Sequence, residues 1–154
     1  MPSTTEMWVH GHAVEVECGG QGKLTLRRNA RGTLFLESGN QIVAHWFHIA
    51  IPTPTLNGVK PTLKRVFIDY DCDRNNGSVT IDSVHFFDGS SRSSPVWTAS
   101  GLTNHDVKEW AITSHPQISK GLGITVNVIF GQPGGGNPER SIEFYAAGAE
   151  FETP

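Results

Sequence analysis

The amino-acid sequence predicts an all-β fold, an antiparallel β-sandwich with a jelly roll as the favoured arrangement. Short apolar runs with the two-residue alternation of β-strands recur along the chain, and turn residues separate them roughly every 8–12 residues. The 17 glycines and 9 prolines lie mainly between these runs, as expected of many short strands joined by turns. No convincing amphipathic helix is found. We therefore expect about nine or ten strands.

One domain over residues 7–154 is expected, preceded by a flexible N-terminal tail over residues 1–6. Each expected strand alternates in polarity or is continuously apolar, and turn residues end it. The expected strands cover residues 7–18, 23–27, 33–37, 44–51, 63–72, 79–87, 96–99, 107–113, 121–130 and 141–151. In the strand over 79–87 the apolar positions change register near Asp82, which predicts a β-bulge.

Three aromatic residues fall on strand faces opposite the inferred core positions. These are Trp46, Phe67 and Tyr145, and His48 shares the face of Trp46. Apolar rings outside the core must be covered, either by a stacked sugar, by a partner subunit or by a crossing loop of the same chain. We therefore take these four residues as the candidate ligand or subunit contacts.

The totals exclude several classes of protein. A formal net charge of −3 without a basic face argues against a nucleic-acid partner. No apolar run approaches the roughly 18–20 residues of a membrane span. No secretory signal is visible at the N-terminus, so a cytoplasmic location is expected, with non-classical export left open. Cys18 and Cys72 make no disulfide framework and are expected to be buried thiols rather than a bridge.

Several motifs carry a resemblance to a known family. They read MWVHGH at residues 7–12, WFHIAIPTP at 46–54, VHFFDG at 84–89 and AGAEF at 147–151. With them the chain resembles a family of small uncharacterised bacterial β-sandwich proteins that share a WFHIPIPTP-type motif. The resemblance implies the fold and assigns no activity. Residues 77–84 are more weakly similar to a strand of galactose-binding-like jelly rolls, which are common in carbohydrate-binding modules.

One acidic segment has the composition of a calcium site. Asp69, Asp71, Asp73 and Asn75 supply the oxygen ligands that Ca²⁺ prefers. The segment is not an EF-hand, because the glycine at the sixth place and the glutamate at the twelfth are missing. The alternative is a solvated acidic strand end followed by an Asn-Gly turn. Calcium is therefore a possible cofactor, and no other cofactor is expected.

His10 and His12 have a spacing that suits a transition metal. Cupins use such a pair with a following carboxylate, but the later glycine-proline-histidine element of cupins is missing here. The alternative is a pair of structural histidines that flank a glycine bulge.

Three functions compete. The first is a non-catalytic structural or self-associating protein, a homo-oligomer that assembles through the exposed aromatic face. The second is a carbohydrate-binding module that stacks a glycan on that face, with possible help from calcium. The third is a cupin-like metalloenzyme. The sequence contains no nucleophile elbow and no catalytic spacing, so catalysis is not expected.

Overall fold

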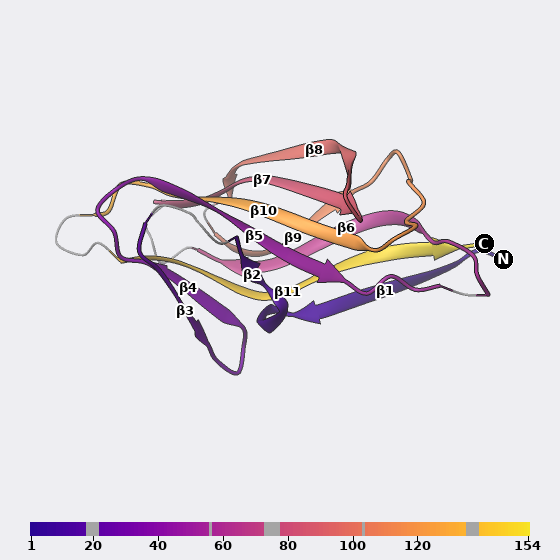
Figure 1. Cartoon of the computed structure of the whole chain (residues 1–154), viewed down its shortest axis with the longest axis horizontal. Coiled ribbons are helices and arrows are strands. Elements are labelled where there is room, and N and C mark those ends of the chain that lie inside the picture. The colour runs from indigo at the N-terminus through magenta and orange to yellow at the C-terminus, as the bar shows by residue number, and fades with distance from the viewer. Residues whose placement is uncertain (18–21, 56, 73–77, 103, 135–138) are drawn as a thin grey trace.

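The computed structural model describes residues 1–17, 22–55, 57–72, 78–102, 104–134 and 139–154, with the backbone alone for residues 93–101. Within these residues, eleven strands form two antiparallel sheets. The sheets lie one above the other as the two layers of a sandwich (Figure 1). The structure therefore confirms the predicted all-β sandwich.

The six-stranded sheet is centred on the C-terminal strand. Its order is β3 (Leu24–Arg28), β4 (Thr33–Glu37), β11 (Arg140–Thr153), β6 (Thr62–Asp71) and β9 (His105–Ala111), with β1 (Ser3–His10) also paired to β11. Strands β4 and β1 share one edge of β11, where β4 pairs with residues 140–144 and β1 with residues 146–153. A bulge at Tyr145 separates the two segments.

The five-stranded sheet contains the two apolar strands over residues 43–51 and 122–130. Its order is β2 (Glu15–Val16), β5 (Val43–Ile51), β10 (Leu122–Phe130), β7 (Val79–Asp88) and β8 (Ser91–Leu102). The β-bulge predicted near Asp82 is confirmed, because the pairing of β7 with β10 shifts between Ser83 and Ile81. β8 starts earlier than expected, directly after a turn at Gly89, whose φ of 60° suits glycine.

The inner faces of the two sheets pack into one hydrophobic core. In β5 the residues expected to point inward, including Phe47 and Ile49, are buried. The ring of Phe47 lies 4.7 Å from that of Phe35 and 5.3 Å from that of Phe144, which joins the two sheets. The opposite residues of β5, Trp46 and His48, are left on the outer face of the sheet.

The N-terminal segment differs from the prediction. β1 begins at Ser3, so four of the six residues expected to form a tail pair with β11. The expected single strand over residues 7–18 is wrong, because a 3₁₀ turn at Gly11–Ala13 separates β1 from β2. Gly11 is buried where any Cβ would overlap the carbonyl oxygen of Phe144. The chain uses this turn to pass from one sheet to the other.

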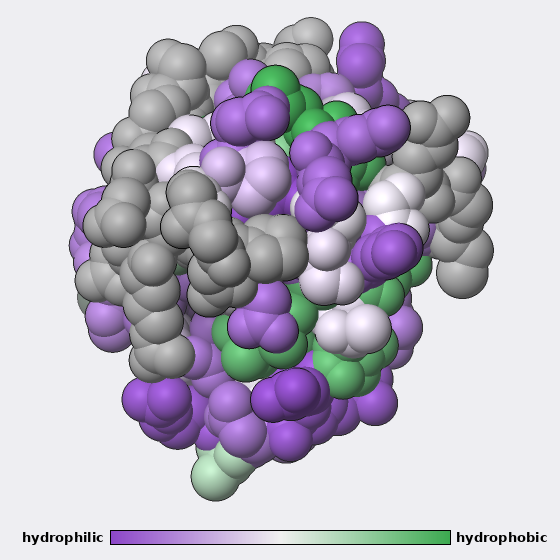
Figure 2. All heavy atoms as spheres, turned by 90° about the vertical axis from the view of Figure 1, so that its left-hand side faces the viewer, coloured by the Kyte–Doolittle hydropathy of each residue, from purple (hydrophilic) through white to green (hydrophobic). Residues whose placement is uncertain are grey.

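The two termini lie together at one end of the sandwich (Figure 1). Figure 2 shows the opposite end, where hydrophilic side chains surround small apolar patches. Cys72 is a buried thiol outside any disulfide, and its Sγ lies 3.5 Å from the carbonyl oxygens of Leu102 and Asn104, whereas Cys18 lies outside the described residues. In the described part of the chain, no helix has the length and apolar character needed to cross a membrane.

Candidate functional site

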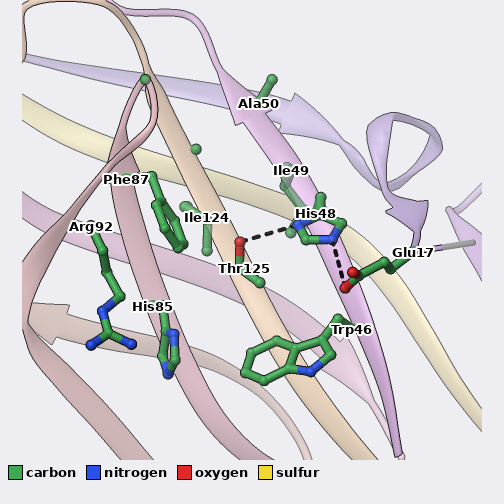
Figure 3. Close-up of a pocket in the computed structure, with 12 residues that line it drawn as sticks. Glu17, Trp46, His48, Ile49, Ala50, His85, Phe87, Arg92, Ile124 and Thr125 are labelled. Carbon is green, nitrogen blue, oxygen red and sulfur yellow. Dashed lines mark hydrogen bonds and ion pairs between the residues drawn. The ribbon is translucent and has the colours of Figure 1, made fainter. Parts of the chain in front are cut away.

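A groove of about 600 Å³ lies on the outer face of the five-stranded sheet. It runs across β5, β10 and β7 and reaches the start of β8 (Figure 3). The strand pairing sets its side chains in cross-strand rows, because residues that alternate along a strand share a face. The rows are Trp46–Asn127–Ser83, His48–Thr125–His85 and Ala50–Gly123–Phe87.

Small residues form the floor at one end of the groove. Ala50 and Gly123 stand side by side on β5 and β10, and Phe87 of β7 stands next to Gly123. A Cβ built on Gly123 would meet no heavy atom within 4 Å. The sheet is therefore hollow here, with the ring of Phe87 beside the hollow (Figure 3).

Two polar partners hold the imidazole of His48. Its Nδ1 lies 3.2 Å from the hydroxyl oxygen of Thr125, and its Nε2 lies 3.4 Å from a carboxylate oxygen of Glu17. Both partners lie within the groove (Figure 3). The backbone supports this arrangement, since the N–H of Glu17 donates to the carbonyl oxygen of Trp46 at 2.9 Å. The ring of His48 is thus oriented before any ligand arrives.

The remaining groove side chains combine aromatic and basic groups. The rings of Trp46 and His85 lie 5.2 Å apart and are tilted by 58°. Burial, with a further contribution from Arg92, lowers the pKa of His85 below its ordinary value of 6.5. His85 is therefore neutral at pH 7 and can both donate and accept a hydrogen bond. The exposed side chain of Arg92 lies beside it (Figure 3).

The chemistry available in the groove is that of binding. Its aromatic surfaces can pack against an apolar ligand face, and its imidazole, hydroxyl and guanidinium groups can hydrogen-bond polar substituents. Glu17 is the only carboxylate among the described residues that line it. A pair of carboxylates for acid–base catalysis is thus not found among those lining residues.

Comparison with known proteins places the chain in a family. The model of DUF6623, a family of unknown function, matches residues 1–153. The chain belongs to the DUF6623 family. No curated protein matches it significantly.

Three solved structures are similar to this DUF6623 protein to different degrees. A xylan-binding module, CBM15, superposes with a TM-score of 0.52 at 14% identity, over 96% of this chain and 97% of the other. A family 11 carbohydrate-binding module from Clostridium thermocellum gives a TM-score of 0.42 at 8% identity, over 94% of each chain. TmCBM61 gives 0.44 at 12% identity, over 96% of this chain and 86% of the other. At 14% identity, the similarity to CBM15 shows a shared fold and nothing about function.

The predicted contact residues do not form one surface in the DUF6623 protein. Trp46 and His48 line the groove, but Phe67 and Tyr145 belong to the other sheet. Phe67 is only 4% exposed, because the ring of Trp8 stacks on it at 4.9 Å. Phe67 is thus covered by its own chain, through strand β1 and not through a crossing loop.

Tyr145 is likewise engaged within its own sheet. Its hydroxyl lies 3.2 Å from a carboxylate oxygen of Asp71 and 3.1 Å from one of Glu143. The guanidinium of Arg31 lies 5.9 Å from the centre of its ring. Burial and the two nearby carboxylates raise the pKa of Tyr145 to about 12, so the phenol stays protonated at neutral pH.

The predicted calcium segment is described only in part. Asp73 and Asn75 lie outside the described residues. Asp69 is 3.9 Å from the imidazole of His105, and burial raises the pKa of its carboxyl. Asp71 is buried and contacts the hydroxyl of Tyr145. Calcium binding at this segment stays a prediction.

His10 and His12 have local partners. Their rings lie 4.3 Å apart, and Nε2 of His12 is 2.7 Å from the carbonyl oxygen of Asn29. His10 ends β1, and its Nδ1 accepts from the N–H of His12 across the 3₁₀ turn. Across the described ranges, no three His, Cys, Asp or Glu side chains converge as metal ligands do. This geometry agrees with the alternative of structural histidines around a glycine.

Sequence reasoning missed most of the groove. Its residues Glu17, His85, Phe87, Arg92 and Thr125 were not among the predicted contacts. A signal for two of them was present, because the apolar positions that follow the bulge in 79–87 leave His85 and Phe87 on the outer face. The order of the strands, which brings these residues beside Trp46, cannot be read from alternation.

Proposed function

We propose that this protein is a non-catalytic carbohydrate-binding module that holds a glycan in the groove across β5, β10 and β7. The observation that carries the proposal is the mixture of groups on one open sheet face. Trp46 and Phe87 offer apolar rings, and His48 and His85 offer hydrogen-bonding groups between them. A sugar ring matches this pattern, since its C–H face is apolar and its hydroxyl groups donate and accept.

The size and order of the groove support the same function. A volume of about 600 Å³ falls within the range of typical ligand sites. The contacts of His48 with Thr125 and Glu17 fix its ring, so less rotational freedom is lost when a ligand binds. The open ends of a sheet face would also allow a polymer to pass across it.

One solved structure with the same fold is a xylan-binding module. This similarity supports xylan as the first polysaccharide to test. The shared fold leaves the choice of glycan open, because specificity depends on the groove side chains.

The test is native gel electrophoresis through gels that contain xylan, mixed-linkage β-glucan or β-1,4-galactan. The wild type should be retarded by at least one polysaccharide. Trp46→Ala should weaken that retention by about tenfold or more, because a central aromatic contact typically contributes at least this much. The matched control is Trp8→Ala, which removes the partly exposed tryptophan of the opposite sheet and should leave retention unchanged.

Two results would contradict the proposal. Free migration of the wild type through every gel would exclude glycan binding of this kind. Loss of retention in Trp8→Ala but not in Trp46→Ala would move the ligand to the other sheet. Thermal unfolding of each variant separates loss of binding from loss of structure.

Self-association remains a second candidate. On the outer face of the six-stranded sheet, Trp8 is 41% exposed and Val107 is 51% exposed, so this surface offers apolar area to a second copy. The molar mass in solution tests it.

A further inference from the structure

We infer that the groove is selective for acidic glycans and that Arg92 binds a sugar carboxylate at the β7–β8 end. The inference rests on the proposed function and adds the ligand class. Its basis is the distribution of charge along the groove, which differs at the two ends.

Arg92 is held at one end of the groove by the strand pairing. It is the second residue of β8 and lies opposite Phe87 of β7, directly after the turn that joins the two strands. The row Ala50–Gly123–Phe87 therefore continues to Arg92. In Figure 3 its guanidinium lies near the ring of His85, on the same side of the sheet as Phe87. A sugar placed against the ring of His85 would lie close to this charge (Figure 3).

Among the side chains that the structure describes, none supplies a counter-charge to the guanidinium of Arg92. In the part of the chain that the structure describes, it forms no ion pair or hydrogen bond, and Glu17 lies at the opposite edge of the groove, where it pairs with His48. Arg65 on the other sheet shows the contrast, since it pairs with both Glu109 and Glu150. The guanidinium of Arg92, which lies in the groove, is therefore available to a ligand.

The chemistry of the site matches a carboxylate. A planar guanidinium binds a carboxylate through two parallel hydrogen bonds, a geometry that a sugar hydroxyl does not provide. His85 stands beside it and can donate a further hydrogen bond from its neutral ring. Phe87 supplies an apolar surface for the ring that bears the carboxylate. A uronic acid unit combines a carboxylate for Arg92, an acceptor oxygen for His85 and an apolar ring face for Phe87.

The groove also selects against a purely anionic ligand. Glu17 would repel a carboxylate at the β2 edge, so the ligand must be neutral there. A glycan with an occasional uronic acid unit can place a carboxylate at Arg92 and a neutral sugar at Glu17. A densely charged polyanion would also place a carboxylate beside Glu17, where it is repelled.

The test compares polysaccharides that differ only in charge. Glucuronoxylan, polygalacturonate and alginate are each prepared in native form and in carboxyl-reduced form, in which the uronic acids have become neutral sugars. The wild type should bind native glucuronoxylan about tenfold more tightly than its reduced form in affinity electrophoresis. Arg92→Gln should remove this difference. Arg92→Lys should keep part of it, because lysine retains the charge but cannot form the two parallel hydrogen bonds of a guanidinium.

The control variant is Arg27→Gln, which removes an exposed charge from β3 on the other sheet and should leave the preference intact. Equal binding of native and reduced glucuronoxylan, or an unchanged preference in Arg92→Gln, would overturn the inference and leave the proposed function standing. Failure to bind any of these polymers in either form would also overturn the inference, and the proposed function would fall with it only if the gels with xylan, mixed-linkage β-glucan and β-1,4-galactan gave no retention either.

Discussion

Glu37 shows how this fold accommodates a buried carboxylate. Its side chain is fully buried, and it accepts hydrogen bonds from the N–H groups of Lys23 and Gly39 at 2.7 Å and from His45 at 3.0 Å. Arg140, also buried, donates to the carbonyl oxygen of Gly39 at 2.6 Å. The network holds the loop after β4 against the start of β3. A carboxylate can be buried here because its oxygens accept hydrogen bonds.

We expect Glu37→Gln to destabilise the protein by about 1.5–3 kcal/mol, the typical value of hydrogen bonds to a charged group. An amide keeps one acceptor oxygen and presents a donor where an acceptor is needed. Glu109→Gln is the control, because its exposed ion pair with Arg65 should contribute less than about 1 kcal/mol. Chemical denaturation of the three proteins at pH 7 measures both effects.

The same carboxylate predicts a pH dependence. Burial acts to raise the pKa of Glu37, but the hydrogen bonds from Lys23, His45 and Gly39 outweigh it, and the pKa lies below 4.5. A carboxyl with a lowered folded-state pKa adds stability above its unfolded-state pKa, and this stability is lost as the pH falls through the folded-state value. The acid side of the stability profile should therefore be shallower in Glu37→Gln. Profiles of equal slope would contradict this account.

At the residue scale, the sequence indicated only part of the candidate site. The alternation in 44–51 was enough to put Trp46 and His48 on an outer face, where the structure has them. It could not show that Phe67 is covered by Trp8, since that contact joins strands β6 and β1 across β11. Side-chain direction follows from local geometry, whereas neighbours depend on the order of the strands.

At the scale of the elements, β11 organises the six-stranded sheet. Its edge changes partner from β4 to β1 at the bulge of Tyr145. Two glycines, Gly11 and Gly32, pack against the carbonyl oxygen of Phe144 beside this bulge. Neither position has room for a Cβ, so the two segments that meet β11 there depend on glycine.

Gly32→Ala should destabilise the protein by about 2 kcal/mol or more, because the added methyl group would overlap the backbone of β11. Gly123→Ala is the matched control. Its Cβ would enter open space in the groove and should change stability by less than about 1 kcal/mol. Thermal unfolding of both variants decides the matter, and equal unfolding temperatures would show that Gly32 is not required.

Most strands were predictable because alternation and turn residues are local signals. The bulge in β7 was also visible, as a change of register in the apolar positions. The break at Gly11 was not, because it depends on how closely β11 approaches that residue. The same limit explains why the sequence predicts nine or ten strands, whereas the described residues form eleven.

At the scale of the molecule, the two outer faces of the sandwich differ. The six-stranded sheet covers its own ring of Phe67 with Trp8 and pairs Arg65 with two carboxylates. The five-stranded sheet keeps a hollow above Gly123 and leaves Arg92 without a counter-charge among the described residues. On the six-stranded sheet, the ring and the charge named above thus have partners within the chain. The five-stranded sheet is open to a ligand.

Filling the hollow tests this account most directly. Gly123→Leu would begin an apolar side chain in open space of the groove, since nothing lies within 4 Å of a Cβ built at this position. Titration calorimetry would use oligosaccharides of the polysaccharide that the wild type retains best. We predict that the wild type binds and that Gly123→Leu binds at least about tenfold more weakly, with its unfolding temperature maintained. Equal affinity in the two proteins would show that the glycan does not occupy this groove.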